Sequence, residues 1–156
     1  METEDSRNLL VPVEDSEDCE RALQWAVDNI YRKGDVVHLV HVVPHRQLSY
    51  SRSFTVSDDH GEQPELKAEQ ARTFIEERFT SLLEKRKVPY HVSILRGADD
   101  AESVGQMICE KADELRAVAI IMAAHNKGRL VRFIVGSTTQ YCIRNSHVTV
   151  LVMQNN

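Results

Sequence analysis

Cysteine is scarce in this chain of 156 residues, and long apolar runs are missing. The three cysteines, Cys19, Cys109 and Cys142, are widely separated and form no Cys-x-x-Cys pair, which argues against a disulfide scaffold and favours a reducing compartment. No apolar run approaches the length of a membrane span, and the acidic start METEDSRN lacks the basic and apolar regions of a signal peptide. We therefore expect a cytoplasmic protein that does not bind membranes, with access to the nucleus left open.

Positive charge is also in deficit. Lysine and arginine number 19 against 24 for aspartate and glutamate, a net charge of -5, which argues against a general affinity for nucleic acid or anionic membranes. Fixed-period repeats and low-complexity tracts are absent as well. The length suits one compact domain, so we expect residues 1–156 to form a single domain with an ordinary packed core.

Familiar catalytic and metal-binding motifs are missing too. The chain has no Gly-x-Ser-x-Gly elbow, His-Glu-x-x-His pair or Walker A sequence. We expect no dedicated enzyme. His38, His41 and His45 are close in sequence, but His38 and His41 point to opposite faces of a strand, and no partner stands at zinc-site spacing. We predict no catalytic residues and no structural metal.

The chain does contain a regular alternation of apolar runs and amphipathic segments. The runs predict strands at 9–13, 36–43, 90–95, 118–122 and 148–152, and helical spacing of apolar residues predicts helices at 16–30, 65–87, 99–115 and 137–144. Pro89 ends the second helix, and Gly97 indicates a turn after the third strand. Residues 45–64 are polar, and we expect a mobile insertion there, with two alternatives open: it is disordered, or it covers the site.

Alternation of strands and helices requires a parallel sheet with helices on both faces. The predicted fold class is therefore α/β, with a doubly wound parallel sheet. In such sheets ligands bind beyond the carboxyl ends of the strands, where the strand order reverses. If the first strand lies beside the fourth, residues 12–15 come to lie beside residues 123–126.

The most informative segment runs from Ala119 to Val152. An apolar run and a polar turn lead to Gly136-Ser137-Thr138, which opens a predicted helix. Unpaired backbone N–H groups and the positive end of the helix dipole favour an anion at such a place, and glycine allows a ligand to approach the backbone. We predict a phosphate site here, with one alternative left open, in which Ser137 serves only as a helix N-cap.

Separate segments of the chain match a known pattern: LLVPVEDSEDCERALQWA near the start, LVHVVP after it, GSTTQYC after the polar turn and VTVLVM at the end. Together they resemble the universal stress protein A family, in a single-domain form similar to its plant and algal members, from Leu9 to Met153. The resemblance implies an adenine nucleotide alpha hydrolase-like fold. This is a three-layer α/β/α sandwich whose five parallel strands have the order 3-2-1-4-5.

Nucleotide-binding members of that family carry G-x2-G-x9-G-[ST] after the fourth strand and an aspartate at the end of the first. Here the first two glycine positions fall on Ala123 and Asn126, the aspartate position falls on Glu14, and Gly136-Ser137 remains. The Ala123 methyl costs about 1 kcal/mol in a tightly packed contact. Asn126 tolerates the left-handed backbone region, and Glu14 keeps the charge of aspartate.

Position by position, the resemblance implies the contacts of an adenine nucleotide. Pro12, Val13 and Glu14 lie near the base, Val42 contacts adenine through its backbone, Ala123, His125 and Asn126 lie near ribose and phosphate, Gly128 adds flexibility to the turn, and Gly136, Ser137 and Thr138 hold the distal phosphates. Asp15 offers a second carboxylate that could face the pocket instead of Glu14, and Lys127, Arg129 and Arg132 add positive charge. The expected ligand is ATP or another adenine nucleotide, with or without Mg²⁺. With bound ATP we expect at most a weak ATPase, with His125 or Glu14 as its candidate base.

Two functions follow from the resemblance. In the first, the chain is a dimeric stress-response module, for signalling or protection, that binds ATP, ADP or AMP at the ends of strands one and four. In the second, favoured by Ala123, the pocket is degenerate and the chain is a non-nucleotide-binding interaction or chaperone-like protein. In both we expect a homodimer through Val148–Val152, a flat apolar strand at a sheet edge. The sequence leaves the nucleotide, the stress and the protein partner open.

Overall fold

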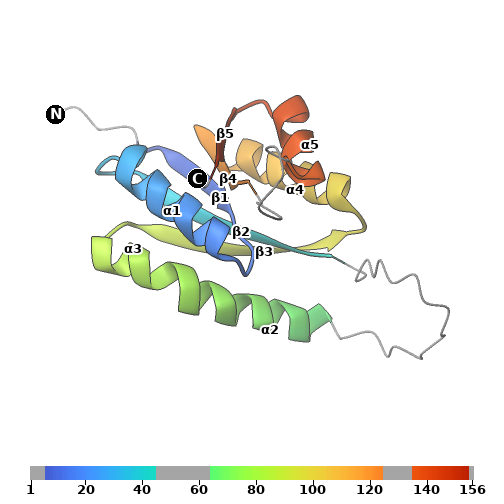
Figure 1. Cartoon of the computed structure of the whole chain (residues 1–156), viewed down its shortest axis with the longest axis horizontal. Helices are drawn as coiled ribbons and strands as arrows, with labels where there is room; N and C mark the ends of the chain where they lie inside the picture. The colour runs from blue at the N-terminus through green and yellow to red at the C-terminus, as the bar shows by residue number, and fades with distance from the viewer. Residues whose placement is uncertain (1–5, 45–63, 125–134, 155–156) are drawn as a thin grey trace, which may run out of the picture.

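The computed structural model describes residues 6–44, 64–124 and 135–154, which form a parallel sheet flanked by helices (Figure 1). The strands are β1 (Asn8–Pro12), β2 (Val36–Pro44), β3 (Tyr90–Ala98), β4 (Ala119–Ala123) and β5 (Thr149–Met153). Their order is β3-β2-β1-β4-β5, which confirms the predicted order. β2 lies on one side of β1 and β4 on the other, so the strand order reverses at β1.

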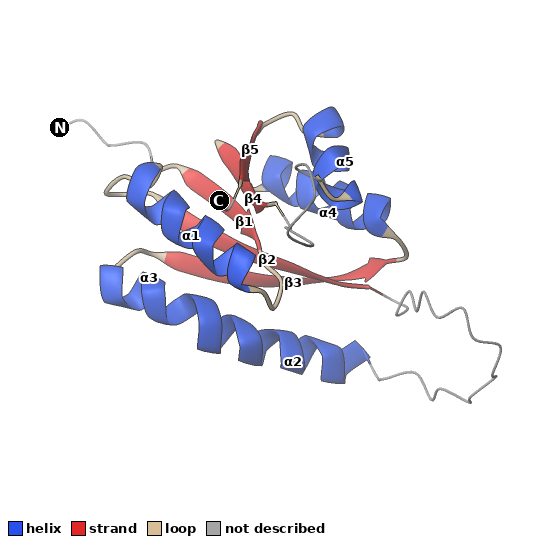
Figure 2. Ribbon diagram, viewed as in Figure 1, coloured by secondary structure: helices blue, strands red, loops and turns tan. Residues whose placement is uncertain are grey.

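The helices form two layers, one on each face of the sheet (Figure 2). One layer contains α1 (Glu17–Asn29), α2 (Pro64–Ile75), the π-helical turn η1 (Glu76–Thr80) and α3 (Ser81–Arg86); the other contains α4 (Ala101–Glu114) and α5 (Ser137–Asn145). Because side chains alternate along a strand, Leu9 and Val11 pack into the core of the first layer, whereas Leu10 packs into that of the second. The predicted three-layer sandwich is confirmed.

The third strand continues through the residue where a turn is predicted. β2 pairs Val43 with Arg96 and Pro44 with Ala98, so Gly97 is an extra residue in β3. Its φ of 113° lies in the region that favours glycine. Gly97 therefore forms a β-bulge inside the strand, and the predicted turn is wrong.

The predicted helix at 65–87 also differs from the structure. It begins one residue earlier, at Pro64, which removes that residue from the predicted loop; proline is common at the first position of a helix. The π-helical turn η1 interrupts it, and there Thr80 Oγ1 donates to the Glu76 carbonyl at 3.0 Å. The rest of that loop, 45–63, lies outside the described residues.

Elsewhere the helix and strand boundaries fall within one or two residues of the predicted ones. The helices in the described part of the chain are all too short or too polar to cross a lipid bilayer.

Candidate functional site

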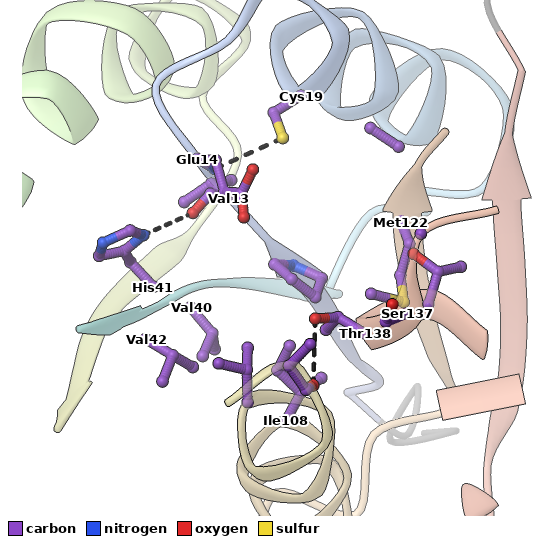
Figure 3. Close-up of a pocket in the computed structure, with 16 residues that line it drawn as sticks. Val13, Glu14, Cys19, Val40, His41, Val42, Ile108, Met122, Ser137 and Thr138 are labelled. Carbon is purple, nitrogen blue, oxygen red and sulfur yellow. Dashed lines mark hydrogen bonds between the residues drawn. The ribbon is translucent and has the colours of Figure 1, made fainter. Parts of the chain in front are cut away.

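A cavity of about 260 Å³ opens at the carboxyl ends of β1, β2 and β4, where the amino ends of α4 and α5 also meet (Figure 3). The strand order reverses around β1 at this edge, and parallel sheets bind ligands at such points. One part of the wall is apolar, with Val40, Val104, Ile108 and Met122. The remainder carries the backbone turn after β1 and the start of α5. This combination can hold a flat apolar ring at one end and an anion at the other.

All the predicted site residues that the structure describes lie in the wall of this cavity. They are Pro12, Val13, Glu14, Val42, Ala123, Gly136, Ser137 and Thr138. Their roles in ligand binding stay predictions. His125, Asn126 and Gly128 lie outside the described residues, as do Lys127, Arg129 and Arg132.

The turn that follows β1 is held by hydrogen bonds from β2 and α1. The Val13 N–H donates to the Val40 carbonyl at 2.9 Å, and His41 Nδ1 donates to the Val13 carbonyl at 2.8 Å. The Glu14 N–H donates to Cys19 Sγ at 3.4 Å. Figure 3 shows the contacts of His41 and Cys19 converging on this turn. The backbone at the base of the cavity is therefore fixed by neighbouring elements.

Cys19 and His41 line the cavity, although the sequence analysis did not select them. Cys19 lies in the first turn of α1, where its N–H donates to Oγ of the N-cap Ser16. Burial raises the pKa of the Cys19 thiol, which favours the protonated thiol near neutral pH. His41 immediately precedes Val42 in β2. A search that included the neighbours of each selected residue would have found His41, and the Ser16 cap would have placed Cys19 at this edge.

The two adjacent carboxylates after β1 are directed to different places. Glu14 lines the cavity, whereas Asp15 does not. Asp15 Oδ1 lies 2.5 Å from Arg78 Nε, and Glu20 contacts the same guanidinium at 3.2 Å. Asp15 therefore faces η1, and Glu14 is the one of the two carboxylates that lines the cavity.

Among the described helices, α1, α4 and α5 begin beside this cavity, and their first N–H groups are satisfied differently. Ser16 caps α1, and Asp100 caps α4 in a capping box with Ser103. Hydrogen bonds from Ser103 hold the pKa of the Asp100 carboxyl below its usual value. The N-cap of α5 is Gly136, which has no side chain to act as a cap. The first N–H groups of α5 thus differ from those of α1 and α4 in lacking a cap from their own N-cap residue.

The residues at the start of α5 are small. Among the described residues, a Cβ atom added to Gly136 would meet nothing within 4 Å, its chain neighbours aside. Thr138 Oγ1 donates to the Ala101 carbonyl at 3.2 Å and ties α5 to α4. Ser137 is exposed. The positive end of the α5 dipole therefore opens onto the cavity, an arrangement that suits an anion.

The described part of the cavity wall offers a carboxylate, a thiol and an imidazole, from Glu14, Cys19 and His41. Across the described ranges, no group of three or more His, Cys, Asp or Glu side chains is placed to hold a metal ion. His41 packs against Phe74 of α2, whereas His38 lies near Lys111 of α4. The predicted placement of His38 and His41 on opposite faces is confirmed.

Comparison with known proteins identifies relatives along nearly the whole chain. The sequence model of the universal stress protein family matches residues 6–154. Two curated universal stress proteins of Arabidopsis thaliana, PHOS32 and PHOS34, are 28% and 26% identical over 161 and 164 residues. The alignments cover 95% of this chain but 64% and 62% of those relatives, so the chain spans less than two thirds of their length.

Solved structures of universal stress proteins share the fold. One from Archaeoglobus fulgidus in complex with dAMP is 20% identical, with a TM-score of 0.65 and coverage of 94% of this chain and 96% of that chain. A family protein from Arabidopsis thaliana with AMP bound is 17% identical, with a TM-score of 0.64 and coverage of 96% and 92%. At these identities the likeness shows the fold, and it agrees with the predicted α/β class.

Proposed function

The chain belongs to the universal stress protein family, and from this premise we propose that it binds an adenine nucleotide in the cavity at the ends of β1 and β4. One observation carries the proposal: residues from β1, β2, β4 and α5 surround one space, and a helix N-terminus without a side-chain cap opens onto it. The relatives crystallised with AMP and dAMP support the class of ligand.

The cavity suggests how the nucleotide lies. The base occupies the apolar part, near Val42 and Val104, and the phosphate accepts hydrogen bonds from the backbone at the start of α5. Glu14 accepts a hydrogen bond from a sugar hydroxyl or from the base. No described residue lies within 4 Å of a Cβ atom built on Gly136, its chain neighbours aside, so the proposal includes ADP and ATP, with or without Mg²⁺.

Two neighbouring carboxylates provide a matched test by isothermal titration with AMP and ATP. Glu14→Gln removes the charge in the cavity, whereas Asp15→Asn removes one that pairs with Arg78 outside it. We expect saturable binding by the unsubstituted chain and about a tenfold weaker affinity for Glu14→Gln, since a hydrogen bond to a charged group contributes roughly 1.5–3 kcal/mol. Asp15→Asn should bind like the parent, because an exposed ion pair adds little to stability.

Absence of saturable binding at millimolar nucleotide, with the protein folded, would end the proposal. Equal losses in both variants would leave nucleotide binding in place but remove Glu14 from the site. Mass spectrometry of molecules that copurify with the recombinant chain gives an independent answer on which nucleotide the cavity selects.

We also propose that the chain forms a homodimer through β5. This strand lies at one edge of the sheet, paired with β4. Val150, Leu151, Val152 and Met153 are only partly buried, and Ile143 of α5 is 51% exposed. Natural proteins seldom leave an apolar edge strand bare, and pairing with a second copy would cover it.

A second function has one observation in its favour. Ala123 places a buried methyl in the wall of the cavity where nucleotide-binding relatives are expected to have glycine. A chain whose pocket has lost its ligand would act as a dimeric interaction or chaperone-like protein. Client protection that is unaffected by nucleotide and by Glu14→Gln would support this function. In either case we propose a cytoplasmic stress-response role, in signalling or protection.

A further inference from the structure

The hydrogen-bond ladder between β1 and β2 ends in an unusual way at the cavity. The strands are parallel, with Pro12 opposite Val40, and the Val13 N–H donates to the Val40 carbonyl at 2.9 Å. Continuation of the ladder would direct the Val42 N–H to the Val13 carbonyl. Within the described ranges that bond is not formed. The Val13 carbonyl instead accepts from His41 Nδ1 at 2.8 Å (Figure 3).

Within the described ranges, the N–H and C=O of Val42 consequently have no ladder partner on the β1 side of the sheet. Successive residues of β2 direct their N–H and C=O groups to opposite sides: the Val36 N–H donates to Arg7 beside β1, and the Val37 N–H donates to Pro89 beside β3. By the same alternation Val42 faces the β1 side, beyond the end of β1, and it lines the cavity. Its N–H and C=O therefore present a donor and an acceptor to the cavity.

We propose that His41 is a positioning residue that keeps the Val42 N–H and C=O available to the ligand, and that it thereby makes the cavity selective for adenine over guanine. This inference rests on the proposed function. Adenine carries an amino donor beside ring-nitrogen acceptors, which complement a carbonyl and an N–H. Guanine has an oxygen acceptor in place of the amino group, which would face the Val42 carbonyl without a donor.

The surroundings of His41 fix its ring and the proton that it donates to the Val13 carbonyl. A carbonyl oxygen only accepts, so Nδ1 carries the proton and donates it to Val13. The ring packs edge-on against Phe74 of α2, with centroids 5.0 Å apart. A packed ring with a fixed donor thus takes the acceptor that Val42 would otherwise use. An asparagine amide can place a donor near the position of Nδ1, whereas phenylalanine keeps only the ring.

Three variants test the proposal: His41→Phe, His41→Asn and the control His91→Phe. His91 is exposed at the opposite, amino-terminal end of β3. The affinities for AMP and GMP are measured by titration, and exchange of the Val42 amide hydrogen is measured by NMR in the ligand-free protein. The ratio of the two affinities and the exchange rate report on the Val42 peptide rather than on global stability.

For His41→Phe we expect AMP to bind about tenfold more weakly while GMP changes by less than about twofold, since one hydrogen bond to the base edge is lost. His41→Asn should restore the preference, and His91→Phe should leave it unchanged. In the unsubstituted protein the Val42 amide should exchange faster than the paired amides of β2, and in His41→Phe it should become protected.

An unchanged AMP-to-GMP ratio in folded His41→Phe would overturn the proposal, as would a Val42 amide as well protected as its paired neighbours in the unsubstituted protein. The exchange rate of the Val42 amide in the unsubstituted protein can overturn the proposal even if His41→Phe does not fold. If the unsubstituted chain binds no nucleotide, the proposed function fails, and the exchange data still show whether His41 frees the Val42 N–H.

Discussion

Gly136→Asp separates binding from folding at the start of α5. Gly136 is the N-cap of α5 with φ -62° and ψ 159°, values that residues other than glycine adopt readily. An added Cβ meets no atom of the described part of the chain within 4 Å, its chain neighbours aside. Aspartate is among the best N-cap residues and exceeds glycine there by a few tenths of a kcal/mol. Its charge adds about 0.3–1 kcal/mol through the helix dipole. The ligand-free variant should therefore melt at the same temperature as the parent or slightly above.

Nucleotide affinity should change in the opposite direction. A carboxylate about 5 Å from a bound phosphate, at an effective dielectric constant of about 20, repels it by roughly 3 kcal/mol per unit charge. That energy corresponds to a loss of affinity of about a hundredfold. The new carboxylate also accepts the N–H hydrogen bonds that the phosphate would use.

Calorimetric titration with AMP and thermal melting of the ligand-free protein together make the assay. Gly136→Asn is the matched control, because it caps the helix with a side chain of the same size and no charge, and its loss of affinity should be clearly smaller. A higher salt concentration should reduce the difference in AMP affinity between Gly136→Asp and Gly136→Asn, since exposed charges are screened. If folded Gly136→Asp binds AMP with an affinity within about threefold of the parent's, a difference of under about 1 kcal/mol, no phosphate lies at the start of α5.

Two further outcomes follow from other parts of the chain. Val150→Lys should halve the mass measured in solution by light scattering. The control His147→Lys, at an exposed residue outside β5, should leave the mass unchanged. An unchanged mass for Val150→Lys counts against the proposed interface. Burial, with the nearby charges of His91 and Lys111, lowers the pKa of His38. The unfolded chain therefore binds more protons, so the free energy of unfolding should fall as pH drops below about 6.5, and His38→Gln should flatten that fall in denaturant titrations.

Most of the fold was predictable because local patterns and global packing agree. Apolar runs such as Leu9–Val13 are long enough only for strands, and the helices between them require parallel crossovers. The errors have local causes. Gly97 indicates a turn, but the same positive φ serves a bulge, and only the pairing of β3 with β2 distinguishes the two. The η1 turn has no strong sequence signal, since a threonine such as Thr80 can also bond the carbonyl four residues earlier in a regular helix.

The parts of the candidate site that backbone groups form were predictable from the sequence. The contributions of individual side chains were less predictable. Pattern and resemblance selected Val42 and Gly136, both of which line the cavity. His41 and Cys19 were missed because they act on the turn after β1 through single hydrogen bonds, at 2.8 Å and 3.4 Å, that depend on three-dimensional neighbours. No spacing rule relates His41 to a carbonyl that precedes it by 28 residues.

We expect the residues that replace the family's motif residues to weaken the proposed nucleotide binding less than the loss of the motif suggests. The groups we expect to contact the ligand are chiefly peptide N–H and C=O groups, at Val42 and at the start of α5. Strand order, the end of β1 and the first turn of a helix place these groups, and side-chain identity enters mainly through the space it occupies. Ala123 adds one methyl to the wall, which should weaken binding by about 1 kcal/mol rather than abolish it. Charge at Gly136 acts on the backbone groups themselves, and should therefore lower affinity more than either Ala123 or the loss of charge at Glu14. Loss of the donor at His41 should differ from both by changing the selectivity between adenine and guanine.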